Sequence, residues 1–135
     1  MVRTLTVRYR IVAGRTELLP LCSLRLFGPK GGATVEALID SGATYSVFPT
    51  KAADDTGIPL PAAADQWLQS LSLAVAGRRA DVDIALQQRR WRAPVVFVER
   101  LPFRYALLGR SGVFSQFREV AFVETLLSPH VDFRW

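Results

Sequence analysis

The stretch Ala37-Leu38-Ile39-Asp40-Ser41-Gly42-Ala43-Thr44-Tyr45-Ser46-Val47-Phe48-Pro49 carries the most information about the fold of this chain. A short apolar strand ends at an acidic residue, Asp40, which is followed by a tight Ser-Gly turn and then by a second apolar segment. Gly42 allows a backbone conformation and a close approach that a Cβ atom would hinder. Asp-Ser-Gly is also a common turn tripeptide, so the flanking apolar segments are what make Asp40 a candidate catalytic residue.

The composition narrows the chemistry that such a chain could perform. Its 135 residues suit one domain, and half of them are hydrophobic, which is enough for a sizeable core. The single Cys22 and single His130 exclude a disulfide within the chain and a structural zinc site, which takes about four Cys or His ligands. A Ser–His or Cys–His enzyme would depend on His130, five residues from the end of this sequence. Carboxylates are therefore the better catalytic candidates.

The formal charge of +5 comes mainly from arginines that are spread from Arg3 to Arg134. A basic balance is typical of nucleic-acid-binding proteins, but a solvated surface explains dispersed charges equally well. The one local cluster, Arg89, Arg90 and Arg92, leaves nucleic-acid binding open as a less favoured alternative, which predicts strongly salt-dependent association. No stretch approaches the ~18 apolar residues of a membrane-spanning helix, so we expect a cytoplasmic protein with no membrane partner.

Alternating and apolar segments predict a chain made mostly of strands. Two short helices are expected, the second spanning about two turns, and a turn at Ala76–Arg79 should close a hairpin. The predicted strands are Val2–Val12, Leu21–Phe27, Thr34–Ile39, Leu71–Val75, Val82–Leu86, Trp91–Val98 and Val120–Val123, and the predicted helices are Pro49–Thr56 and Ser111–Phe117. Many short strands with two small helices indicate an all-β domain.

Two motifs in this order resemble those of the retropepsin-like aspartic proteases. The first is an apolar strand followed by Asp-Ser/Thr-Gly-Ala with a Ser or Thr three residues later, which Asp40–Ser46 matches. The second is a pair of apolar residues followed by Gly and Arg, which Leu107–Arg110 matches, with Gly109 lying 69 residues after Asp40. The continuation Gly-Arg-Ser-Gly-x-Phe is most similar to that of bacterial single-domain, gag-polyprotein-type aspartyl proteases.

The resemblance implies a closed, barrel-like retropepsin (acid protease) fold over residues 1–135, with a core at about 21–123 and a tail at 124–135. It also implies an aspartic endopeptidase that works as a homodimer, because one chain supplies a single Asp40 and the reaction uses two carboxylates around one water. An extended peptide or protein would be the substrate. No metal or organic cofactor is expected.

Further site residues follow from the same resemblance. Support of the loop and contact with the substrate backbone are expected from Ser41, Gly42, Ala43 and Thr44. The tip of a flap over the cleft is expected at Ala76, Gly77 and Arg78, and packing beneath the active site at Leu107, Leu108, Gly109 and Arg110.

Two departures from the family pattern keep a second function open. Viral members carry Asp where Thr44 stands, so Arg110 lacks the carboxylate partner that it would have in them. The expected flap tip has one glycine, whereas viral flaps are glycine-rich. The alternative is a catalytically weak or inactive peptide-binding module on the same fold.

Overall fold

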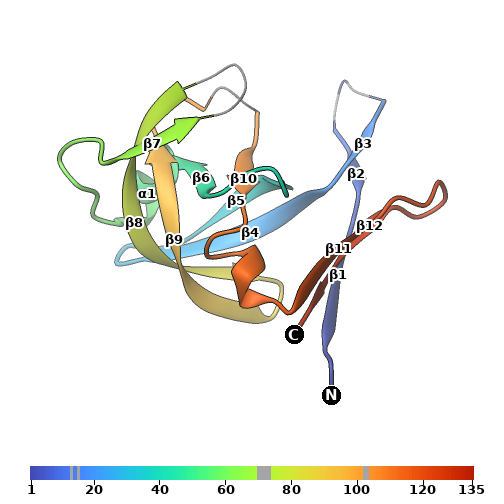
Figure 1. The fold of residues 1–135 in the computed structure, drawn as a ribbon. Helices are drawn as coiled ribbons and strands as arrows, with labels where there is room; N and C mark the ends of the chain where they lie inside the picture. The colour runs from blue at the N-terminus through green and yellow to red at the C-terminus, as the bar shows by residue number, and fades with distance from the viewer. Residues whose placement is uncertain (13, 15, 70–73, 102–103) are drawn as a thin grey trace.

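Six strands form a closed ring in the computed structural model, which describes residues 1–12, 14, 16–69, 74–101 and 104–135 (Figure 1). Neighbouring strands follow the order β4-β5-β10-β6-β9-β8, and pairing between β8 and β4 closes the ring. The six are β4 (Leu21–Gly28), β5 (Gly31–Ile39), β6 (Ser46–Pro49), β8 (Ala74–Leu86), β9 (Arg89–Val98) and β10 (Ala106–Leu108). The expected all-β, barrel-like retropepsin fold is confirmed.

Parallel pairing explains why two strands of the ring are apolar along most of their length. β10 runs parallel to β5, and β6 runs parallel to β9. Parallel strands are usually covered on both faces, which requires continuous apolar runs rather than alternation. Val95–Val98 is such a run and is buried throughout, as are all three residues of β10.

The α-helix α1 (Thr50–Thr56) confirms the first expected helix and lies outside the ring. It ends at Gly57, whose positive φ of 73° suits a residue without a side chain. The second helix is shorter than the two turns expected, because only Phe114–Gln116 forms a 3-10 turn, η1. Phe117 is already extended, with φ −120° and ψ 148°, and leads the chain into the next strand.

The turn predicted at Ala76–Arg79 is wrong. These residues lie inside β8, which pairs with β7 (Gln66–Gln69) on one side and with β9 on the other. The prediction relied on Gly77, but a glycine within a strand can instead mark a close approach of neighbouring chain. A Cβ at Gly77 would clash with the side chain of Val96. The predicted strand Leu71–Val75 falls partly on residues 71–73, outside the described residues.

A separate three-stranded sheet joins the two ends of the chain. Its order is β1 (Thr4–Arg8), β12 (His130–Arg134) and β11 (Glu119–Val123), all antiparallel. The sheet projects from the barrel toward the lower right of Figure 1, beside the small hairpin of β2 (Arg10–Ile11) and β3 (Leu18–Leu19). No helix in the described ranges is long and apolar enough to cross a membrane.

Gly28 should tolerate no side chain, because β4 approaches the end of α1 closely at that point. A Cβ there would clash with the carbonyl oxygen of Thr56 and lie 2.8 Å from Ile58 Cγ1. We expect Gly28→Ala to lower the free energy of unfolding by about 1–3 kcal/mol, measured by urea denaturation. Gly32→Ala is the matched control in the same hairpin, since the nearest contact of its Cβ would be the flexible end of Arg25 at 3.1 Å and the others are ordinary van der Waals contacts. Equal stability of the two variants would contradict this packing.

Candidate active site

Asp40 lies where strand β5 leaves the barrel core. Ile39, the last residue of β5, is 2 % exposed, whereas Asp40 is half-buried. The parallel neighbour β10 continues the pairing by one residue, because the Asp40 N–H donates to the Leu108 carbonyl at 3.0 Å. The backbone that carries the Asp40 carboxyl group is therefore anchored by the buried residue before it and by β10 beside it.

The turn that follows fixes the direction of the Asp40 side chain. The Gly42 N–H donates to Asp40 Oδ1 at 2.9 Å, and the Ala43 N–H donates to the Asp40 carbonyl at 3.2 Å. A side-chain oxygen that accepts from the backbone two residues later is the usual Asx-turn geometry. One carboxylate oxygen is thus engaged by the loop.

The second motif packs against the Asp40 loop through a set of short polar contacts. Gly109 N donates to the buried Ser46 Oγ at 3.0 Å, Arg110 N to the Ala43 carbonyl at 2.9 Å, and Ser111 N to the Thr44 carbonyl at 2.7 Å. A Cβ at Gly109 would lie 2.8 Å from the Ala43 carbonyl oxygen, so only glycine fits there. The two motifs, far apart in the sequence, therefore form one structural unit.

A cleft of about 360 Å³ opens beside Asp40. One wall is the Asp40 loop and the strand that follows it, and the opposite wall is β7. Its lining combines the polar side chains of Asp40, Thr44 and Gln69 with mainly apolar neighbours: Gly42, Ala43, Tyr45, Val47, Trp67, Leu68 and Leu107. A groove of this composition next to a carboxylate suits an extended peptide with apolar side chains.

The structure brings most of the predicted site residues together but not the predicted flap tip. Gly42, Ala43, Thr44 and Leu107 line the cleft with Asp40, whereas Ser41 is exposed in the turn. Ala76, Gly77 and Arg78 lie within β8, where Arg78 donates to the Pro61 carbonyl at 3.4 Å. Their expected role above a substrate stays a prediction.

Sequence reasoning missed β7 as a wall of the cleft. Trp67 is 70 % exposed although it is the largest side chain in the lining. The segment Gln66–Gln69 is short and polar at both ends, so it shows no clear strand pattern of its own. The one sequence feature that could have revealed this strand is the segment with which it pairs, Ala74–Gly77.

The arginine cluster Arg89, Arg90 and Arg92 and its neighbours have structural partners. Asp83 accepts from both Arg90 and Arg92 at 3.3 Å. Trp91 Nε1 donates to the Gly112 carbonyl at 2.7 Å, and its ring is half-buried. These contacts give Asp83 and Trp91 structural roles next to the arginine cluster.

Cys22 and metal chemistry add nothing to the site. Burial raises the pKa of the Cys22 thiol to about 12, with a smaller opposing effect from Arg10, so the thiol is a poor nucleophile. Among the residues that the structure describes, no group of three or more His, Cys, Asp or Glu side chains is placed to hold a metal ion.

In this structure a turn with an aspartate follows β5, and the parallel strand β10 supports it inside a closed barrel. This arrangement defines the class of retropepsin-like proteins. Sequence comparison agrees, because the family model for aspartyl proteases matches residues 28–111 and so covers both motifs. The chain belongs to this aspartyl protease family. It matches none of the curated proteins with which it was compared.

Solved structures support the same fold. A retropepsin-like aspartic protease from Rickettsia conorii is similar with a TM-score of 0.65 and 10 % identity, over 99 % of this chain and 93 % of that chain. EIAV protease, solved with the inhibitor HBY-793, is similar with a TM-score of 0.54 and 17 % identity, over 73 % of this chain and 88 % of that one.

Removing the Ser46 hydroxyl should loosen the contact between the two motifs. Ser46→Ala leaves the buried Gly109 N–H without its acceptor, which should cost about 1–3 kcal/mol in the free energy of unfolding. Urea denaturation measures this cost. Ser23→Ala is the control, because its hydroxyl bonds to Glu36 in an exposed position and its loss should change little. A Ser46→Ala protein as stable as the control would contradict the assigned role.

Proposed function

We propose that this protein is an aspartic endopeptidase that acts as a homodimer and hydrolyses peptide bonds. The observation that carries the proposal is the Asp40 loop, because its turn hydrogen bonds and its bracing by Gly109 hold one carboxyl group at the edge of a cleft. Family membership supports the same chemistry.

A dimer is required because one chain offers one such loop. A two-fold axis places identical residues opposite each other, so a single Asp40 can supply a pair. Two carboxyl groups about 3 Å apart cannot easily both ionise, and the pair therefore shares one proton. Its titration belongs to the pair rather than to either residue.

The shared proton gives the two carboxyl groups different roles. The ionised member takes a proton from a water molecule held between them, and this water attacks the carbonyl carbon of the peptide bond. The protonated member donates to the carbonyl oxygen and later helps to protonate the leaving nitrogen. Ser41, which is exposed in the turn, would contact its counterpart across the axis.

The cleft supplies the binding surface for an extended peptide. Its backbone would pair with the Asp40 loop and with β7, as in strand addition. Thr44, which lines the cleft, would face the substrate at the position where the viral members carry Asp. Trp67 and Leu68 from β7 would then cover the peptide from the opposite wall.

A peptide-binding module without catalytic activity is the second candidate. Arg110 favours it, because this side chain is exposed and contacts the loop only through its backbone N–H. Such a module would hold the same extended peptides without cleaving them, so turnover is what separates the two functions.

Substitution of Asp40 tests the proposal directly. Asp40→Asn should reduce peptide cleavage at least about 100-fold, because it removes the shared acid and base while keeping an oxygen that can accept from Gly42 N. Cleavage of a peptide library by purified protein, followed by mass spectrometry, provides the measurement. Asp54→Asn, the same change at an exposed position on α1, should cleave like the wild type. Undiminished cleavage by Asp40→Asn would overturn the mechanism.

The pH profile of kcat should be bell-shaped with its maximum on the acid side of neutral. At low pH both carboxyl groups are protonated and the base is lost, and at high pH both are ionised and the acid is lost. Steady-state kinetics from pH 3 to 9, with sedimentation velocity at each pH to monitor the dimer, give the profile. A rate that keeps rising above pH 8 would contradict a carboxyl pair.

A further inference from the structure

The strand β7, which forms one wall of the cleft, is an edge strand. Among the strands that the structure describes, it pairs with β8 and with no other. In Figure 1 it lies beside the upper part of β8. Three of its four residues, Trp67, Leu68 and Gln69, line the cleft. The position of this wall therefore depends on how β7 is held against β8.

The strand β8 is itself firmly held in the ring. It pairs with β9 from Arg78 to Leu86 and also with β4. A Cβ at Gly77 would clash with the side chain of Val96 and lie 3.0 Å from the Phe97 carbonyl oxygen, so β8 and β9 are in close contact there. The part of β8 that faces β7 is therefore a fixed base to which the wall is attached.

Asp65 joins β7 to this base at the residue directly before the strand begins. Its N–H donates to the Gly77 carbonyl at 3.0 Å, and its Oδ1 accepts from the Arg79 N–H at 2.8 Å. The side chain thus supplies Arg79 with the acceptor that a longer β7 would have offered from its own backbone. A carboxylate makes a stronger acceptor for a backbone N–H than a neutral group does.

A second set of contacts holds the segment that leads into Asp65. Arg78 donates from Nη1 to the Pro61 carbonyl at 3.4 Å. Its Nη2 lies 3.8 Å from Glu99 Oε1, but Glu99 is exposed, so solvent weakens this ion pair. These contacts secure the chain before the strand, whereas the Asp65 carboxylate secures the point at which the strand begins.

Asp65 is close enough to the cleft to affect the position of its wall. It precedes Trp67 by two residues, and at about 3.3 Å per strand residue the two are separated by only about 7 Å of chain. The facing wall is held differently, because the carbonyls of Ala43 and Thr44 accept from the backbone that follows Gly109. One wall is thus fixed through the barrel core and the other through Asp65.

We propose that Asp65 is a positioning residue for substrate binding, because its carboxylate sets the place of β7 relative to the Asp40 loop. It acts through the three cleft residues of β7 and does not touch the reacting atoms. The proposal rests on the proposed function, in which an extended peptide lies between these two walls.

The variant Asp65→Ala tests this role by steady-state kinetics on an internally quenched peptide with apolar residues around the scissile bond. Without the carboxylate β7 is held less well, and the bound peptide has to order the wall itself, which lowers its affinity. KM should rise at least about threefold while kcat stays within about twofold, because Asp40 and its loop are unchanged. A general loss of stability would instead reduce the active fraction, and so the apparent kcat, without raising KM.

Two further variants serve as controls. Asp65→Asn keeps an oxygen that can accept from the Arg79 N–H, so its KM should lie within about twofold of the wild-type value. Asp81→Ala removes a carboxylate from an exposed position farther along β8 and should behave like the wild type. A wild-type KM in Asp65→Ala, or an equal rise of KM in Asp65→Ala and Asp65→Asn, would overturn the proposal.

Hydrogen exchange tests the contact without reference to cleavage. The Arg79 amide should exchange at least about tenfold faster in Asp65→Ala than in the wild type, because local opening of the hairpin then costs less free energy. The amides of β7 should also exchange faster, whereas those of Ala106–Leu108 in the barrel core should keep their rates. Unchanged exchange at Arg79 and along β7 would contradict the role of Asp65.

Failure of this proposal is distinguishable from failure of the proposed function. The proposed function fails through undiminished cleavage by Asp40→Asn or through binding of peptides without cleavage. In the second case the dissociation constant of the same peptide, measured by fluorescence anisotropy, takes the place of KM and should rise by the same factor in Asp65→Ala. An unchanged dissociation constant would overturn the role of Asp65 there too.

Discussion

The parallel pairing of β5 with β10 is the constraint on which the rest of the molecule depends. It joins residues almost seventy positions apart and extends one hydrogen bond past the strand, to the N–H of Asp40. Since β10 is buried throughout and the paired end of β5 buries Ala37 and Ile39, neither can shift register without exposing apolar side chains. The position of the candidate catalytic group is therefore fixed by the core of the barrel rather than by its own loop.

The same pairing lets a small chain hold the Asp40 loop in a defined shape. Gly109 brings its backbone against the Asp40 loop, and Ser46 satisfies the buried N–H that this close approach creates. These contacts lie within one chain, so the loop has its shape before any partner binds. In the dimer that we propose, association would only have to align two preformed loops, which costs less entropy than ordering them at the same time.

The sequence allowed the barrel and the Asp40–Gly109 unit to be predicted because each depends on a local pattern at a fixed spacing. The turn at Ala76–Arg79 was predicted wrongly, because Gly77 lies within β8 and serves the close packing of this strand against Val96. β7 shows no pattern of its own and becomes a wall of the cleft only through its partner strand. The place of His130 in the terminal sheet depends on pairing with β1 across more than 120 residues, which no local pattern reveals.

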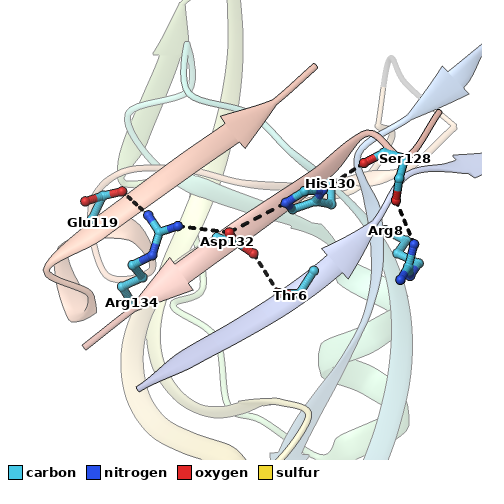
Figure 2. Close-up of polar contacts among 7 residues, drawn as sticks. All are labelled: Thr6, Arg8, Glu119, Ser128, His130, Asp132 and Arg134. Atoms are coloured by element: carbon cyan, nitrogen blue, oxygen red, sulfur yellow. Dashed lines mark hydrogen bonds and ion pairs between the residues drawn. The ribbon is translucent and has the colours of Figure 1, made fainter. Parts of the chain in front are cut away.

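The central position of β12 has a consequence for the way this protein is made. The Thr6 hydroxyl on β1 donates to Asp132 on β12 (Figure 2), so the first strand can form its contacts only after β12 has been synthesised. While the ribosome is still adding the barrel strands, β1 lacks its pairing strand β12, and the three-stranded sheet can close only after residue 134 has emerged. Barrel formation and completion of the sheet are thus separated in time, and a nascent chain can form its cleft before its two ends are joined.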